Sequence, residues 1–159
     1  MKTKLLFICL GNICRSPAAE GVMKSLVSHQ ECAHLYKIDS AGIGDWHVGQ
    51  LPDHRMRSCG AKRGYDFSSH ARQFTLKDFD RFDYIIVMDY MNYDDVTRQA
   101  RTDTDKNKVI CLADYLEHHP GQQTVPDPYY GDEKDFEFAL DLIEDGCIGL
   151  LAKLQHPNT

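Results

Sequence analysis

The chain has 159 residues, of which 42% are hydrophobic and 26% charged, and its formal net charge is −6. This length is sufficient to bury a substantial core, and the composition is typical of a soluble globular protein. The negative charge argues against nucleic acid as the main partner. It would also repel an anionic ligand weakly, so an anion site must depend on local fields. We expect one domain over residues 1–159, without repeats or linkers.

The first residues contain a short apolar run that is interrupted too early for a leader sequence. Lys2 and Lys4 precede residues 5–10, and Arg15 follows before any plausible cleavage site. No run approaches the length of a membrane span. We therefore expect residues 5–9 to form the first β-strand, and we expect no membrane association.

Strands and helices alternate along the chain. The predicted strands are Leu5–Cys9, Tyr36–Ser40, Tyr84–Met88 and Val109–Leu112. The nearly continuous apolar runs at 5–9 and 84–88 are typical of strands that are covered on both faces. The predicted helices cover residues 17–32, about 53–63, a segment from Met91 and about 134–154. Ser16 is the expected N-cap of the first helix, with Pro17 at its first position.

The last predicted helix has one apolar face and an acidic start that suits the helix dipole. The apolar face consists of Phe136, Leu140, Ile143, Cys147, Leu150, Leu151 and Leu154. The alternation of strands and helices predicts an α/β fold with a parallel sheet and right-handed crossovers. Ligands in such folds bind at the carboxyl ends of the strands, which is where Cys9 lies.

The seven residues that follow the first strand carry most of the functional information. They are Cys9, Leu10, Gly11, Asn12, Ile13, Cys14 and Arg15. A short loop before a helix directs its backbone N–H groups at one point and forms an anion site. Gly11 and Asn12 tolerate the positive φ that a tight loop needs. The local positive potential should hold Cys9 as a thiolate, so the loop predicts phosphoryl transfer through a phosphocysteine.

Other side chains are candidates for binding the phosphate, assisting Cys9 and contacting the rest of the substrate. Arg15 offers a bidentate fork to two phosphate oxygens, and Ser16 is placed to donate a hydrogen bond to the Cys9 thiolate. Asp127 lies between two prolines, which favour an extended and rigid loop, and it is our candidate for the general acid. Tyr129 and Tyr130 are candidate walls of a slot for an aromatic substrate. Trp46, which follows the second strand in a glycine-rich loop, is a candidate second wall.

The loop from Cys9 to Pro17, together with Asp127-Pro128-Tyr129-Tyr130-Gly131, closely resembles the low-molecular-weight protein tyrosine phosphatases. Shorter segments fit the same family in order, namely 39–42, 45–46, 69–72 and 88–92. The resemblance spans nearly the whole chain. It implies a four-stranded parallel sheet flanked by helices, and hydrolysis of phosphotyrosine without a metal or other cofactor. The implied partners are tyrosine-phosphorylated proteins, with inorganic phosphate or other oxyanions as product or inhibitor.

The resemblance also implies roles for individual residues. Cys9 corresponds to the nucleophile, Arg15 to the phosphate clamp, and Asp127 to the acid that then serves as the base for water. Further positions correspond to residues that hold the loop by hydrogen bonds or that line the substrate slot. The first group is Asn12, Ser40 and His70, and the second is Trp46, Tyr129 and Tyr130.

The chain has six cysteines, at positions 9, 14, 32, 59, 111 and 147. None forms a C-x-x-C pair, and the histidines complete no zinc pattern. The count is too low for a disulfide scaffold, so we expect a reducing cytoplasm. The spacing of Cys9 and Cys14 suggests a reversible disulfide that protects the nucleophile from over-oxidation.

Three alternatives remain. A thioredoxin-coupled arsenate reductase shares the fold and the first loop, but it needs further redox cysteines after the third strand, and residues 89–108 contain none. A non-catalytic phosphotyrosine-binding module does not need Cys9 or Asp127. A nucleotide P-loop ends in Gly-Lys-Ser/Thr, which is absent here. We expect a monomer or a weak dimer.

Overall fold

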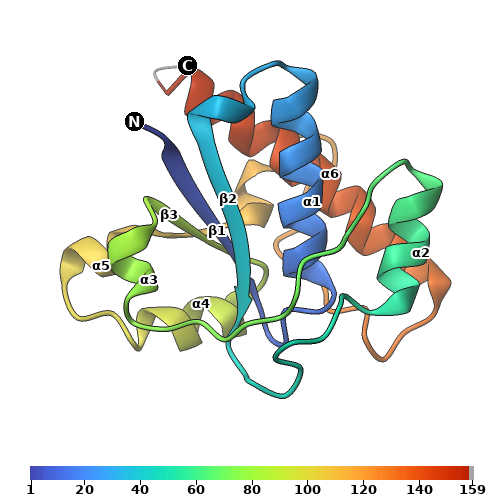
Figure 1. Cartoon of the computed structure of the whole chain (residues 1–159), viewed down its shortest axis with the longest axis horizontal. Coiled ribbons are helices and arrows are strands. Elements are labelled where there is room, and N and C mark those ends of the chain that lie inside the picture. The colour runs from blue at the N-terminus through green and yellow to red at the C-terminus, as the bar shows by residue number, and fades with distance from the viewer. Residues whose placement is uncertain (158–159) are drawn as a thin grey trace.

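The computed structural model describes residues 1–157 and has a four-stranded parallel sheet in the order β2-β1-β3-β4 (Figure 1). The strands are β1 (Thr3–Cys9), β2 (Tyr36–Gly42), β3 (Tyr84–Val87) and β4 (Val109–Cys111). All four predicted strands are confirmed, with ends that differ by one or two residues. The predicted fold class, a parallel sheet flanked by helices, is confirmed as well.

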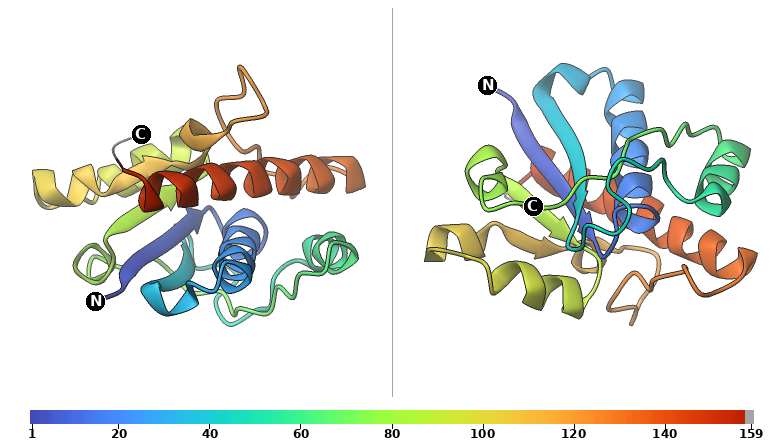
Figure 2. Two further views of the ribbon diagram at one scale, coloured as in Figure 1. Left: turned by 90° about the horizontal axis from the view of Figure 1, so that it is seen from above. Right: turned by 60° about the horizontal axis from the view of Figure 1, so that its bottom comes forward.

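Helices cover both faces of the sheet (Figures 1 and 2). One face packs against α1 (Arg15–His29), α2 (His54–Lys62) and α6 (Glu133–Gln155), and the other against α3 (Asp78–Arg81) and α4 (Tyr90–Thr97). The fifth helix, α5 (Asp103–Asn107), lies beside β4, and two 3₁₀ turns cover Ala33–Leu35 and Leu112–Tyr115. Because side chains alternate along a strand, Leu5 and Phe7 face the first helix group, and Leu6 and Ile8 face the second.

The longest helix, α6, is close to its prediction. Asp132 caps it and forms a capping box with Asp135. Of the seven predicted apolar positions, six are buried, and Leu154 is half-buried. Among residues 1–157, no helix combines the length and the apolar character that crossing a bilayer requires.

The start of α1 differs from the prediction. The helix begins at Arg15, so Ser16 lies inside its first turn, and the prediction of Ser16 as N-cap is wrong. The N-cap position is Cys14, whose side chain makes no capping hydrogen bond. The hydroxyl of Ser16 instead faces Cys9 and the loop. The helix also ends at His29 rather than at residue 32.

The first two strands end side by side, which places the loop after β1 against the end of β2. Cys9 pairs with Gly42 in the parallel register. A Cβ atom on Gly42 would lie 2.9 Å from the backbone carbon of Gly11 and 3.0 Å from the backbone nitrogen of Asn12. Glycine is therefore required at position 42, because any side chain there would displace the loop.

Candidate active site

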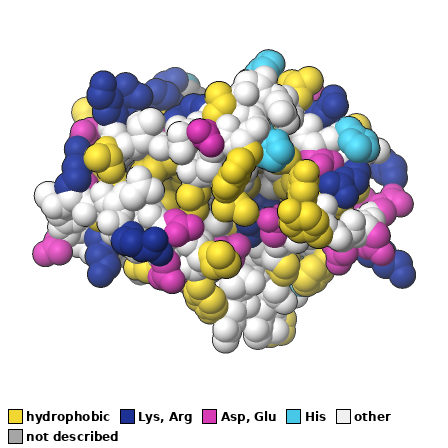
Figure 3. All heavy atoms as spheres, turned by 90° about the horizontal axis from the view of Figure 1, so that it is seen from below, with side chains coloured by type: hydrophobic (Ala, Val, Ile, Leu, Met, Phe, Trp, Pro, Cys, Tyr) yellow, Lys and Arg dark blue, Asp and Glu magenta, His cyan; other side chains and the backbone are white. Residues whose placement is uncertain are grey.

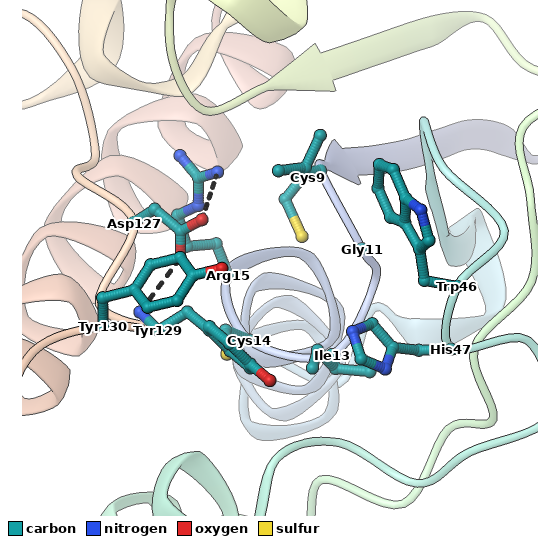
Figure 4. Close-up of a pocket in the computed structure, with 11 residues that line it drawn as sticks. Cys9, Gly11, Ile13, Cys14, Arg15, Trp46, His47, Asp127, Tyr129 and Tyr130 are labelled. Atoms are coloured by element: carbon teal, nitrogen blue, oxygen red, sulfur yellow. Dashed lines mark hydrogen bonds and ion pairs between the residues drawn. The ribbon is translucent and has the colours of Figure 1, made fainter.

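A cavity of about 340 Å³ opens at the carboxyl ends of the strands, on the face shown in Figure 3. Its lining combines the loop after β1 with residues of two segments that are distant in the sequence, 46–47 and 127–130 (Figure 4). The lining residues are Cys9, Leu10, Gly11, Ile13, Cys14, Arg15, Trp46, His47, Asp127, Tyr129 and Tyr130. The predicted loop, acid and slot residues thus meet in one place.

The loop is held by the side chain of Asn12, which is buried and has a φ of 57°. Its amide oxygen accepts the backbone N–H of Arg72 at 3.0 Å. Its amide nitrogen donates to Ser16 Oγ at 2.8 Å and to Ser40 Oγ at 2.9 Å. Three segments far apart in the sequence therefore fix the curve of the loop, and the left-handed backbone suits asparagine.

The two cysteines of the loop have different surroundings. Cys9 Sγ lies 3.0 Å from Ser16 Oγ. Because Asn12 already donates to Ser16, the hydroxyl hydrogen of Ser16 is available to the sulfur of Cys9. Burial raises the pKa of the Cys14 thiol far above its usual range, and the charges of Cys9 and other neighbours add to this effect. Cys14 is therefore a neutral thiol, and Cys9 is the better candidate for the nucleophile.

Arg15 is 2% exposed and is held by three groups from other segments. Its Nη1 atom donates to Asp89 Oδ2 at 2.6 Å and to the backbone oxygen of Val125 at 2.9 Å, and Nη2 lies 3.6 Å from Asp127 Oδ2. Burial opposes its charge, but the negative groups Cys9, Asp89 and Asp127 raise its pKa above the usual value. The guanidinium is therefore charged and fixed in orientation.

One donor of Arg15 remains unused by the protein. The Nε atom is buried and has no hydrogen-bond partner among residues 1–157. A buried donor without a partner destabilises the folded protein, so such a group often has a catalytic role or binds an ion or a water molecule. Because Arg15 lines the cavity together with Cys9, this donor is available to an oxygen of a bound oxyanion.

The rest of the cavity wall is aromatic and carries Asp127. Asp127 Oδ1 accepts the backbone N–H of Tyr129 at 3.1 Å, and the Tyr129 and Tyr130 rings meet edge to face at 4.9 Å. The side chain of Arg55 donates to the backbone oxygen of Tyr129 at 3.0 Å. Trp46 lies on another side of the cavity (Figure 4) and is 65% exposed. The opening thus has aromatic walls that a flat ring could contact.

His70 is the one predicted residue that the structure does not bring to the loop. It is exposed and does not line the cavity, and none of the hydrogen bonds described for residues 1–157 joins it to Asn12. The prediction for this residue is wrong, because the neighbouring contact comes from the backbone N–H of Arg72, two residues further on. Arg72 is itself fixed by ion pairs with Asp39 and Asp78.

Two residues of the site, Asp89 and His47, were not predicted to belong to it. Asp89 holds Arg15 and also caps α4 by accepting the backbone N–H of Asn92. His47 lines the cavity, and its Nδ1 atom lies 3.1 Å from Gln50 Oε1. An aspartate three residues before Asn92 signals a helix N-cap, but nothing local indicates a contact with a residue 74 positions away. Within residues 1–157, no group of three or more His, Cys, Asp or Glu side chains is placed to hold a metal ion.

A parallel α/β sheet with a cysteine and an arginine in one loop at the carboxyl end of its first strand is typical of enzymes that act on phosphate and related oxyanions. The chain matches the low molecular weight phosphotyrosine protein phosphatase family over residues 4–158, and it belongs to that family. Members of the family are hydrolases, so the protein is a phosphatase of this class.

Individual relatives agree with this assignment. The human low molecular weight phosphotyrosine protein phosphatase is 40% identical over 151 residues, which cover 94% of each chain. A protein tyrosine phosphatase from Entamoeba histolytica, crystallised with Hepes in the active site, is 42% identical. The match has a TM-score of 0.95 and covers 99% of this chain and 100% of that one. Wzb from Vibrio vulnificus in complex with benzylphosphonate has a TM-score of 0.81 and 25% identity, with coverage of 96% and 99%.

Proposed function

We propose that the protein hydrolyses phosphotyrosine in proteins, and also aryl phosphates, through a phosphocysteine at Cys9. The observation that carries the proposal is the buried, unpaired Nε of Arg15 beside Cys9 in one cavity. Arg15 would bind the phosphoryl oxygens, and the backbone N–H groups of residues 10–15 would bind the others. These donors hold the equatorial oxygens in the transition state as well, which is where they accelerate the reaction.

The reaction proceeds in two displacements. The thiolate of Cys9 attacks phosphorus, a sulfur–phosphorus bond forms, and the bond from phosphorus to the tyrosine oxygen breaks as Asp127 gives that oxygen a proton. Water then attacks phosphorus while Asp127 accepts its proton, and the sulfur–phosphorus bond breaks to release inorganic phosphate. The hydrogen bond from Ser16 stabilises the thiolate that attacks first and leaves second.

The aromatic walls favour tyrosine over serine or threonine as the phosphorylated residue. Trp46 and Tyr129 lie on different sides of the cavity, and a phenyl ring between them would bury apolar surface while its phosphate reaches the loop (Figure 4). The crystallised Vibrio vulnificus relative binds benzylphosphonate, which joins an aromatic ring to a phosphonate. We accordingly propose tyrosine-phosphorylated proteins as substrates, and inorganic phosphate as product and inhibitor.

The direct test is hydrolysis of p-nitrophenyl phosphate and a phosphotyrosine peptide in the presence of EDTA. We expect full turnover of both by the reduced enzyme, because no step above needs a metal ion. Loss of activity in EDTA, with recovery on addition of a divalent cation, would contradict the proposed mechanism. Absence of turnover in the folded, reduced protein would reopen the arsenate reductase alternative, which arsenate with thioredoxin would then test.

Replacement of Asp127 by alanine should slow the reaction in a way that depends on the leaving group. General acid catalysis contributes about 10²- to 10⁴-fold, and a phenol with a high pKa needs the proton most. We expect kcat to fall most for phenyl phosphate and least for p-nitrophenyl phosphate. Glu133→Ala, which changes an exposed acidic residue of the same region outside the cavity, is the control. Equal losses across a series of leaving groups would remove Asp127 from the role of acid.

We also propose that Cys14 protects Cys9 from irreversible oxidation. Peroxide would oxidise the Cys9 thiolate to a sulfenic acid, and the Cys14 thiol would condense with it to a disulfide and release water. An added dithiol would then restore both thiols. We expect peroxide-treated wild type to recover activity in dithiothreitol, and Cys14→Ser to recover much less. Equal recovery of the two proteins would refute the protective disulfide.

Other aspects of the proposal concern the protein in its cell. We propose that residues 1–159 act as one catalytic domain in the cytoplasm, as a monomer or a weak dimer, without nucleic acid or membrane as a partner.

The lack of cysteines in residues 89–108 counts against a relay of disulfides, which arsenate reduction needs. A pure binding module would leave Asp127 without a function.

A further inference from the structure

Glu20, in the second turn of α1, has a buried carboxylate that the reaction above does not use. Its side chain is 6% exposed, and a buried carboxylate is costly unless it is paired and hydrogen-bonded. Glu20 Oε2 lies 2.6 Å from Lys24 Nζ, and Oε1 accepts a hydrogen bond from Ser40 Oγ at 2.6 Å. One oxygen thus pairs with a half-exposed lysine, while the other points to the residues that hold the loop.

The hydrogen bonds beyond Ser40 have a defined direction. A backbone N–H only donates, so the amide atom of Asn12 that faces Arg72 is the oxygen, and the nitrogen faces the two hydroxyls. Asn12 therefore donates one hydrogen to Ser40 and the other to Ser16. Ser40 is left to donate its own hydrogen, and the acceptor at 2.6 Å is Glu20.

The chain of hydrogen bonds ends at the sulfur of Cys9. Ser16 accepts from Asn12, so its hydroxyl hydrogen has two possible acceptors. Cys9 Sγ lies at 3.0 Å and the backbone oxygen of Ala41 at 3.5 Å. The shorter contact is the one to the sulfur. Five side chains from α1, β1, β2 and the loop thus form a continuous path from the carboxylate of Glu20 to the nucleophile.

We propose that Glu20 is a positioning residue for Cys9. By accepting the hydroxyl hydrogen of Ser40, it holds the Ser40 oxygen in place as an acceptor for Asn12. The anchored Asn12 amide gives its other hydrogen to Ser16, so that Ser16 donates its own to the sulfur. This inference rests on the proposed phosphatase function and deepens it, because the same hydrogen bond stabilises the thiolate in both displacements. Without the acceptor, the Ser40 hydroxyl turns away, Asn12 loses one of its three anchors, and Ser16 is free to donate to Ala41.

The test is the alkylation of Cys9 by iodoacetamide over a range of pH, followed by peptide mass spectrometry. Iodoacetamide is neutral, so the charge of a variant does not change its encounter with the protein. Arg15 and Asp127, the charged groups that face Cys9, are the same in all variants. Glu20→Met removes the acceptor and keeps the length of the side chain, whereas Glu20→Gln keeps an acceptor oxygen. Lys24→Met removes only the ion pair and is the matched control.

We expect Glu20→Met to lower the alkylation rate at mildly acidic pH by about tenfold, the scale of one hydrogen bond to a charged group. At alkaline pH, where the thiolate forms without help, its rate should equal that of wild type. Glu20→Gln and Lys24→Met should follow the wild-type profile. The kcat of Glu20→Met should fall as well, whereas the kcat values of Glu20→Gln and Lys24→Met should stay close to that of wild type.

Two outcomes would overturn the proposal. In the first, Glu20→Met follows the wild-type profile; in the second, Lys24→Met shows the same loss, which would assign the effect to the ion pair. If Glu20→Met does not fold, Ser40→Ala breaks the same path and must reproduce the tenfold loss, and a wild-type profile would refute the inference. Alkylation does not depend on turnover, so an inactive wild type would refute the phosphatase function and still leave the role of Glu20 decided.

Discussion

Replacement of Cys9 by serine is expected to abolish turnover while leaving oxyanion binding intact. A serine hydroxyl is not ionised at neutral pH and is a poor nucleophile, and removal of a covalent nucleophile in enzymes lowers kcat by about a millionfold. The anion site itself consists of Arg15 and backbone N–H groups, which the substitution leaves in place. Activity should therefore vanish for p-nitrophenyl phosphate and for phosphotyrosine peptides alike.

Binding of phosphate to the Cys9→Ser variant can be followed by the fluorescence of Trp46. Trp46 is the only tryptophan and lines the cavity, so its signal reports on the site alone. We expect inorganic phosphate to change the signal of the variant at concentrations similar to those for wild type. Cys111→Ser, a change outside the cavity, is the control and should retain full activity. Substantial residual turnover in Cys9→Ser would show that another group is the nucleophile.

Replacement of Arg15 by lysine should have the second largest effect, although it conserves the charge. A lysine cannot place two donors in the plane of a phosphoryl group, and it cannot keep the contacts to Asp89 and Val125. We expect kcat to fall by about 10²- to 10³-fold, the loss typical for a missing donor to transition-state charge. The assay is steady-state hydrolysis of p-nitrophenyl phosphate.

Two further variants separate the loss of phosphate binding by Arg15 from other effects of an arginine-to-lysine change. Asp89→Asn retains an oxygen for the cap of α4 but loses the ion pair with Arg15, so it should show a smaller loss in kcat. Arg98→Lys, on the exposed end of α4, should have wild-type kinetics. If Arg15→Lys retained more than a tenth of the wild-type kcat, bidentate binding by Arg15 would not be part of the mechanism.

The sheet and the longer helices are the elements that the sequence predicted well. The strands at 5–9 and 84–88 are nearly continuous apolar runs, and α6 has a regular apolar face, so local patterns determine them. The four-residue α3 and the five-residue α5 were not predicted, because one turn of helix has no periodicity to detect. The start of α1 was misplaced because Ser-Pro is a common helix start, whereas the loop here continues directly into helix at Arg15.

Most of the candidate site could also be predicted, but from the chemistry of its residues and not from apolar patterns. Cys9, Arg15 and Asp127 are recognisable from chemistry and spacing, and the structure brings them to one cavity. The groups that orient them are harder to find, because their contacts join residues distant in the sequence. Asp89 meets Arg15 across 74 positions, and the contact of Arg72 with Asn12 uses a backbone N–H, which no residue type signals.

The most direct test of the mechanism is to trap the covalent intermediate. Wild-type enzyme would be mixed with p-nitrophenyl phosphate, quenched in acid within the first turnovers, digested, and analysed by mass spectrometry. The mechanism predicts one phosphoryl group on the peptide that contains Cys9, and none in Cys9→Ser. Burst formation of p-nitrophenol without any phosphopeptide, or a phosphoryl group on another residue, would contradict a phosphocysteine at Cys9.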